Sequence, residues 1–175
     1  MASLFRVFMQ ARRFSQIRLP SQQNALESNL SPEEFQRRML AAYDVDYDGI
    51  RSACQARAAE LSGVKTLSLC TKGACTLQFT TDGREWKIDA GDGDMPCGEV
   101  YIAPVEELTN GEIYFDTLDA EDYGVYEDIV LSIDSGVITH SNRAALNEHL
   151  SQLAPADKTV CELGFGMNPN VTTRC

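Results

Sequence analysis

The chain has 175 residues and a formal net charge of −11, with 43% hydrophobic and 23% charged residues. These proportions are typical of a globular protein, and a chain of this length can bury a core within one domain. No apolar run approaches the ~20 residues that a membrane-spanning helix needs, so we expect a cytoplasmic protein with no membrane partner.

The charge is unevenly distributed. Residues 1–26 contain four arginines and no acidic residue, which leaves 11 of the 15 basic residues beside all 26 acidic residues in the remainder. An acidic body of this kind repels nucleic acid and anionic membranes. We therefore expect no nucleic-acid partner and favour a basic protein or peptide.

The N-terminal segment differs from the rest in composition. Residues 1–19 interleave apolar side chains with arginines, as in a mitochondrial presequence or a basic surface helix. An added strand, a partner-binding arm and an extension ahead of the true start are the alternatives. We expect an ordered basic arm over residues 1–26 that contributes to a homo-oligomer contact, with a linker at 20–24, and a main domain over residues 27–175.

Two helices are predicted next. Ser31-Pro32-Glu33-Glu34 combines an N-cap, a first-turn proline and acidic residues at the positive end of the helix dipole. The second helix is expected from about Tyr47 to Leu61, with Ser62-Gly63 as its stop. The apolar stripe of the first helix consists of Phe35, Met39, Leu40 and Tyr43.

The connection between these helices, Asp44-Val45-Asp46-Tyr47-Asp48-Gly49, begins like an EF-hand calcium loop. The eighth loop position needs an apolar residue and holds Arg51, and the twelfth needs a bidentate glutamate and holds Gln55. We therefore expect no calcium site and interpret Asp46 or Asp48 as the cap of the second helix.

Short strands dominate the remainder. One more helix, amphipathic, is predicted over Asn142–Leu153. Helices followed by a largely antiparallel sheet with one packing helix define an α+β fold. The expected strands are 64–70, 75–80, 85–89, 99–103, 111–116, 128–133, 137–139 and 159–165.

The six cysteines permit disulfides by their even number, but no secretory signal is evident and a domain of this size needs no disulfide framework. Cys70 and Cys75 flank an expected hairpin turn at Lys72-Gly73, where a cross-strand disulfide is the alternative to free thiols. Only His140 and His149 could join a thiolate zinc site, so none is expected.

Two segments carry chemistry of their own. An acidic, glycine-rich loop leads to Glu99 at the start of an expected strand, and Glu162 lies in an apolar strand just before another glycine-rich loop. A buried carboxylate is costly unless it is paired, hydrogen-bonded or bound to a metal. Two carboxylates at such junctions could form half of a metal site.

These segments resemble motifs of the thermophilic aminopeptidase (aminopeptidase T) family, and the resemblance covers residues 45–171. The later motif of that family is similar to Glu162-Leu163-Gly164-x-Gly166-x-Asn168-Pro169. Its signature resembles Pro96-x-Gly98-Glu99-Val100-Tyr101-x-Ala103-Pro104-Val105-Glu106, followed by Asn110-Gly111-x-Ile113-x-Phe115-Asp116. The resemblance implies a fold like part of the family's catalytic domain.

Members of that family are two-metal exopeptidases whose site is built from two glutamates, two histidines and an aspartate. The resemblance places the glutamates at Glu99 and Glu162, whereas the family's histidines and aspartate follow the second motif, in a stretch that we expect this chain to lack. We interpret His149 as a packing residue. Because a dinuclear site needs several ligands, the resemblance implies a centre without catalysis and without metal or cofactor.

We therefore hypothesise a non-catalytic peptide-binding protein on a truncated aminopeptidase scaffold. The expected peptide-binding residues are Glu99, Glu162, Gly98, Tyr101 and Asn168. Its setting would be ribosomal peptide natural-product biosynthesis, where proteins similar to those of the crocagin pathway hold a precursor peptide for a modifying enzyme. The alternatives are an aminopeptidase-like metalloenzyme completed by a partner chain and a structural assembly subunit.

Overall fold

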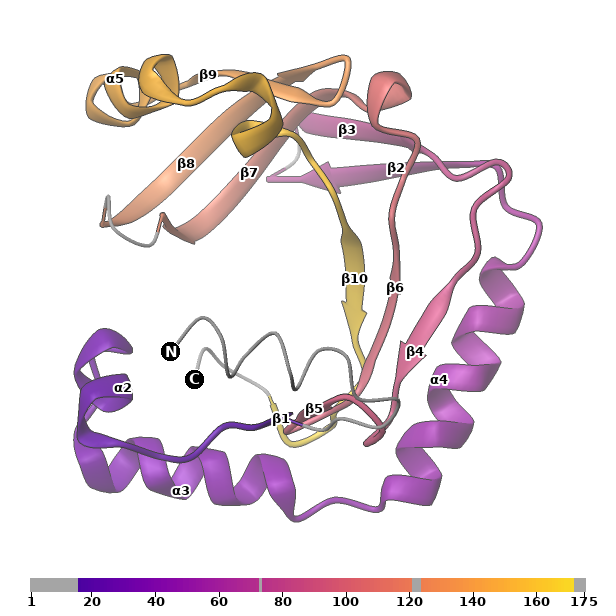
Figure 1. Ribbon diagram of the computed structural model, residues 1–175, viewed down its shortest axis with the longest axis vertical. Coiled ribbons are helices and arrows are strands. Elements are labelled where there is room, and N and C mark those ends of the chain that lie inside the picture. Colours follow the sequence, from indigo (N-terminus) through magenta and orange to yellow (C-terminus); the bar gives the residue numbers. More distant parts are fainter. Residues whose placement is uncertain (1–15, 73, 121–123, 172–175) are drawn as a thin grey trace, which may run out of the picture. The chain divides into compact units, whose positions relative to one another are not determined.

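The computed structural model describes residues 16–72, 74–120 and 124–171, and its helices and antiparallel sheets confirm the α+β class. The described residues form two compact units. Unit 1 contains the residues up to Leu61, residues 86–101 and residues from 164 onward, and unit 2 contains residues 62–85 and 102–163. The two ends of the described chain therefore belong to the same unit (Figure 1).

Unit 1 begins with three helices, α2 (Gln22–Glu27), α3 (Pro32–Tyr43) and α4 (Tyr47–Leu61). The predicted starts of α3 and α4 are confirmed, and Ser31 caps α3 by accepting a hydrogen bond from the Glu34 amide. The expected linker at 20–24 is wrong, because Ser21 caps α2 in the same way. Helix α2 also crosses residue 26, where the arm was expected to end.

The helices of unit 1 bury small apolar clusters. Ala25, Phe35 and Met39 form one cluster between α2 and α3. Leu40, which was expected in the apolar stripe of α3, is 56% exposed, and Ala42 is buried instead. The second cluster packs α4 against the neighbouring strands and consists of Ile50, Cys54, Ala90 and Val100.

The strands that accompany these helices are short. Strands β10 (Leu163–Gly166), β6 (Glu99–Ile102) and β4 (Lys87–Asp89) form a three-stranded sheet in that order. Strand β1 (Gln16–Ile17) pairs in parallel with β5 (Asp94–Met95). An added strand was one alternative for the N-terminal arm, and β1 forms it. Residues 1–15 lie outside the described residues, so the oligomer contact stays a prediction.

The expected strand at 159–165 begins later than predicted. Residues Pro155–Lys158 form a 3-10 turn, and Thr159 makes only an isolated bridge with Val137. Strand β10 therefore starts at Leu163, and Glu162 precedes it with an exposed side chain. The expectation of a buried carboxylate within a strand is wrong for this residue.

Unit 2 is built on a five-stranded antiparallel sheet with the order β2-β3-β7-β8-β9. Helix α5 (Ala144–Gln152) packs against β9 and buries Leu146 and Leu150 in the core of this unit (Figure 1). The predicted sheet with one packing helix is thereby confirmed. The strands are β2 (Thr66–Thr71), β3 (Cys75–Thr80), β7 (Asn110–Asp119), β8 (Val125–Asp134) and β9 (Val137–Ser141).

Two other expectations concern local contacts. The side chain of Asp46 accepts a hydrogen bond of 3.1 Å from the Gly49 amide, which confirms its capping role at the start of α4. The register of β2 and β3 places Cys70 opposite Thr76 rather than Cys75, and both thiols are free. Gly73, at the expected turn, lies outside the described residues. Within residues 16–171, apart from those gaps, no helix is long and apolar enough to cross a membrane.

Candidate functional site

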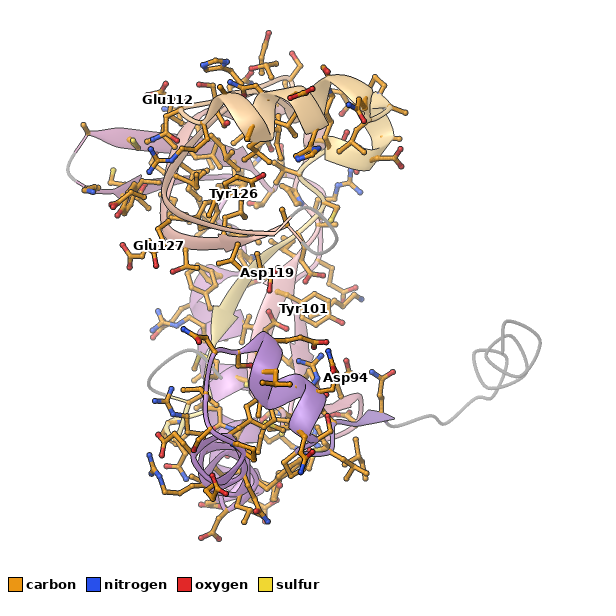
Figure 2. The ribbon with its side chains drawn as sticks, turned by 90° about the vertical axis from the view of Figure 1, so that its left-hand side faces the viewer. Asp94, Tyr101, Glu112, Asp119, Tyr126 and Glu127 are labelled. Carbon is orange, nitrogen blue, oxygen red and sulfur yellow. The ribbon has the colours of Figure 1, made fainter. Side chains whose placement is uncertain are left out.

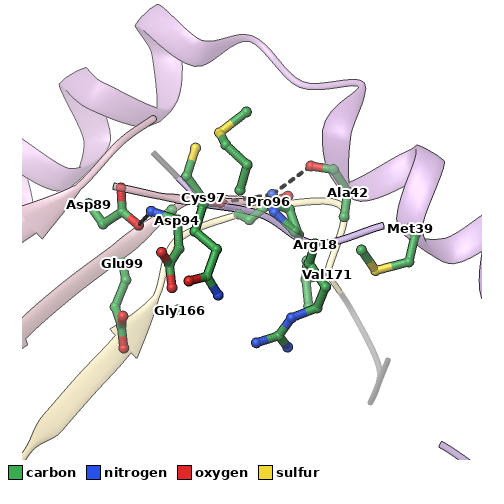
Figure 3. A pocket seen from close by; sticks show the side chains of 14 residues that line it. Arg18, Met39, Ala42, Asp89, Asp94, Pro96, Cys97, Glu99, Gly166 and Val171 are labelled. Atoms are coloured by element: carbon green, nitrogen blue, oxygen red, sulfur yellow. Dashed lines mark hydrogen bonds between the residues drawn. The ribbon is translucent and has the colours of Figure 1, made fainter. Parts of the chain in front are cut away.

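A pocket of about 430 Å³ lies within unit 1 (Figure 3). Its walls come from β1, the end of α3, the segment from Asp89 to Glu99 and the residues that follow β10. Four stretches that are distant in sequence therefore meet around one cavity. The apolar part of the lining includes Met39, Ala42, Pro96 and Val171.

The charged side chains of the pocket are separated. Asp89, Asp94 and Glu99 gather on one side, and Arg18 lies on the other with Met39 (Figure 3). One guanidinium and three carboxylates therefore line the same cavity, which has an acidic end and a basic end. A ligand that carries a positive group and extends through the pocket would suit this arrangement.

Asp89 organises the loop that carries the other carboxylates. Its two oxygens accept hydrogen bonds from the backbone amides of Gly91 (3.3 Å) and Asp94 (3.2 Å). It also lies opposite Glu99 in the register of β4 and β6. The Asp89 carboxylate is thus engaged with the backbone of the loop that carries Asp94.

Asn168 joins three parts of the pocket wall. Its Nδ2 donates hydrogen bonds to the backbone oxygens of Ala42 (2.9 Å) and Cys97 (3.0 Å). Its Oδ1 accepts a hydrogen bond of 3.0 Å from the Asn170 amide. Asn168 therefore has a structural role, in which it holds the end of α3, the Cys97 loop and its own segment together. Its role in peptide binding stays a prediction.

Gly98 is required where these segments approach most closely. Its φ is +116°, a conformation that L side chains rarely adopt, and a Cβ there would lie 2.8 Å from the Asn168 backbone nitrogen. The Gly98 oxygen also accepts a hydrogen bond of 2.8 Å from the Met167 amide. A glycine at this position lets the Cys97 loop lie against the segment after β10.

The carboxylate of Glu99 depends on a second glycine. A Cβ at Gly164 would lie 2.2 Å from Glu99 Oε1, so the absence of a side chain in β10 leaves room for the carboxylate. Together with the approach of Gly98 to Asn168, this places the two motifs of the sequence in contact at two points. Both motifs therefore contribute residues to the pocket lining.

The structure brings together three of the five predicted site residues. Gly98, Glu99 and Asn168 line the pocket. Tyr101 is half-buried two residues along β6 from Glu99, outside the pocket lining (Figure 2). Glu162 belongs to unit 2 and precedes β10.

Sequence reasoning missed three charged residues of the pocket, Arg18, Asp89 and Asp94. Asp94 belongs to the acidic loop that leads to Glu99, so its presence near the site could have been predicted from the sequence. Arg18 belongs to the basic arm, but nothing in the order of residues indicates that β1 pairs with β5. Parallel pairing between distant segments leaves no local sequence signal.

Two thiols of unit 1, those of Cys54 and Cys97, are buried. Burial raises the pKa of Cys54 and of Cys97, which lines the pocket. Burial also raises the pKa of Tyr43, whose hydroxyl donates to the backbone oxygens of Arg18 and Met95. Neutral thiols and a neutral phenol suit packing and hydrogen bonding rather than nucleophilic chemistry.

The described residues contain no group of three or more histidine, cysteine, aspartate or glutamate side chains arranged to hold a metal ion. His140 is exposed and His149 is half-buried, and both belong to unit 2. The metal-binding side chains that line the pocket are the carboxylates of Asp89, Asp94 and Glu99 and the buried thiol of Cys97.

No family model and no curated protein sequence matches the chain. Among solved structures, wild-type AmpT (aminopeptidase T) from Thermus thermophilus aligns with a TM-score of 0.58 and 17% identity over 77% of this chain and 38% of that chain. A 2,5-dihydroxypyridine dioxygenase from Pseudomonas putida KT2440 aligns with a TM-score of 0.65 and 17% identity over 98% of this chain and 55% of that chain. The chain therefore shares a fold with part of both proteins, which confirms a distant structural relationship to aminopeptidase T, and it spans 38% and 55% of their lengths.

Proposed function

We propose that this chain is a non-catalytic peptide-binding protein on an aminopeptidase-like fold. It would hold a precursor peptide for modifying enzymes of ribosomal peptide natural-product biosynthesis. The observation that carries the proposal is the pocket of unit 1, whose lining combines Asp94, Glu99 and Arg18 with an apolar wall.

The size and lining of the pocket fit part of a peptide. A volume of about 430 Å³ lies within the range of small-molecule and side-chain sites. Met39 and Val171 offer apolar contact, while Asp94 and Glu99 can accept hydrogen bonds from an ammonium or guanidinium group. This combination suits a short stretch of peptide with one basic group.

The donor set supports binding rather than hydrolysis. A two-metal hydrolytic centre needs several ligands to clamp the substrate and to activate water. The lining formed by the described residues contains no histidine, and Asp89 already accepts two backbone hydrogen bonds. Asp94 and Glu99 alone would hold a metal ion weakly.

The biosynthetic setting, the cytoplasmic location and the homo-oligomeric state are parts of the same proposal. The biosynthetic setting rests on the resemblance of the motifs at 96–116 and 162–169 and on the acidic net charge of −11, and the homo-oligomeric state rests on the basic composition of residues 1–26. A basic precursor segment would be attracted to such a body, and a modifying enzyme would then receive it.

Fluorescence anisotropy with the precursor peptide encoded beside the gene tests the proposal. We expect Glu99→Gln to weaken binding about tenfold, since a charge-assisted hydrogen bond is lost while the side-chain volume is kept. Gly164→Ala should have a similar effect, because the added Cβ displaces the Glu99 carboxylate. The matched control is Glu148→Gln on the exposed surface of α5. Absence of binding at high micromolar concentration would contradict the proposal.

The second candidate is an aminopeptidase-like metalloenzyme whose ligands are completed by another chain. It is favoured by one observation: the solved structures that share the fold include an aminopeptidase and a dioxygenase, of which this chain spans only part. Metal analysis of the purified protein separates the two candidates. Stoichiometric zinc, with chelator-sensitive release of amino-terminal residues from a test peptide, would replace the binding proposal with this one.

A further inference from the structure

Strand β1 pairs with β5 as an added peptide strand would. The Gln16 amide donates a hydrogen bond of 3.2 Å to the Gly93 oxygen, and the Arg18 amide donates one of 2.9 Å to the Met95 oxygen. The pairing is parallel and only two residues long. In Figure 1, β1 lies along the edge that β5 presents.

Successive side chains from Gln16 to Leu19 alternate between the pocket lining and solvent. Gln16 and Arg18 line the pocket, whereas Ile17 is 62% exposed and Leu19 is 70% exposed. The segment therefore buries little apolar surface, and the hydrophobic effect contributes little to its attachment. It is held by the two backbone hydrogen bonds and by the hydroxyl of Tyr43, which donates to the Arg18 oxygen.

We propose that the edge of β5 is a binding site for an extended peptide with a basic side chain, and that β1 is its occupant within the same chain. The inference rests on the proposed function, because it names the class of ligand for the same pocket. A peptide that adds a strand gains affinity from main-chain hydrogen bonds and specificity from alternate side chains.

The geometry of β1 specifies the ligand. Two alternate amides donate to the oxygens of Gly93 and Met95, and the side chains at those two positions enter the pocket. The second side chain is basic, as Arg18 is, because Asp89, Asp94 and Glu99 make the lining of the same pocket acidic. The residue between them faces solvent and is unrestricted. An incoming peptide must displace β1, so its apparent affinity is its intrinsic affinity multiplied by the fraction of molecules in which β1 is detached.

The test uses the full chain and a fluorescein-labelled synthetic peptide with the sequence of Gln16–Ser21. Arg18→Pro removes the amide that bonds to Met95 and the basic side chain, while Ile17 keeps an extended conformation before a proline. The control is Ile17→Ala, in the same segment but on its solvent side. Trp86 fluorescence verifies that each variant is folded.

We expect the Arg18→Pro protein to bind the labelled peptide about tenfold more tightly than the wild type and the Ile17→Ala protein do. A probe in which glutamate replaces arginine should bind the Arg18→Pro protein about tenfold more weakly, since the pocket is acidic. Equal affinities of folded Arg18→Pro and wild-type protein for the probe would overturn the inference. Equal affinities of the Arg18→Pro protein for the arginine probe and the glutamate probe would also overturn the inference.

The same variants separate this inference from the proposed function. If the Arg18→Pro protein captures the probe while the precursor peptide binds neither protein, the strand site stands and the biosynthetic role falls. If the precursor peptide binds the wild type and Arg18→Pro equally well, and the probe does so too, the proposed function stands and the strand site is refuted.

Discussion

Replacing Asn168 with alanine tests whether one side chain holds the pocket of unit 1 together. Its amide group makes three hydrogen bonds, to the backbone oxygens of Ala42 and Cys97 and from the Asn170 amide. Each hydrogen bond contributes about 0.5–1.5 kcal/mol, and Asn168 is half-buried, so water replaces part of the loss. We expect Asn168→Ala to lower the free energy of unfolding of unit 1 by about 2–3 kcal/mol.

Urea unfolding followed by the fluorescence of Trp86 measures this change. Trp86 is the single tryptophan of the chain. Its ring lies 5.8 Å from that of Phe165 in β10, and it packs against the apolar cluster of α4. The signal therefore reports on unit 1, close to the segment that Asn168 secures. Gln55→Ala, an amide truncation on the exposed side of α4, is the control and should change stability by no more than about 0.5 kcal/mol.

A further variant separates hydrogen bonding from packing. Asn168→Asp keeps the size of the side chain but removes the Nδ2 amide group. The backbone oxygens of Ala42 and Cys97 then lose their hydrogen-bond donor. We expect it to lose at least as much stability as Asn168→Ala. If Asn168→Ala changes the unfolding free energy no more than Gln55→Ala does, the reasoning about this connection is refuted.

Three other predictions concern single residues. Gly98→Ala should destabilise unit 1 by about 1–3 kcal/mol in the same urea assay, because φ is +116° and the Cβ would meet a backbone nitrogen at 2.8 Å. Hydrogen bonds from two arginines of α3 lower the pKa of Glu34 from 4.5 to about 2. The stability that they provide is therefore complete above pH 4.5 and is lost as the pH falls to about 2, and acid unfolding followed by circular dichroism should show less of this dependence in Glu34→Gln. Burial raises the pKa of the Cys54 and Cys97 thiols, so native protein treated with iodoacetamide should be alkylated at exposed Cys70 and protected at these two, whereas peptide mapping after urea treatment should find all three modified.

Elements with local signals could be predicted from the sequence. Helix α4 occupies its expected range because apolar residues recur at helical spacing and Gly63 follows its end. The strand expected at 159–165 begins only at Leu163. Residues Pro155–Lys158 form a 3-10 turn and Thr159 makes only an isolated bridge, and an alternating pattern cannot show where pairing with another strand begins. Ser21 lies in a segment whose polar composition is typical of a linker. That its side chain caps α2 depends on the backbone conformation, which the composition does not show.

The site was predictable only where the motifs describe it. Gly98, Glu99 and Asn168 were identified from motif residues and lie together around the pocket. Arg18 was not, because the sequence contains several arginines in the arm and the one that reaches the pocket is selected by the pairing of β1 with β5. A charge that arrives by tertiary pairing has no sequence signature of its own.

The residues of the pocket divide into those that shape it and those that give it charge. Gly98 and Asn168 contact backbone, so changing them should alter stability and binding together. Arg18 is largely exposed, so changing its charge should alter binding while the unfolding free energy stays within about 0.5 kcal/mol. A scaffold that keeps its shape independently of its charges is what a binding protein requires, because ligand preference can then change without loss of the fold.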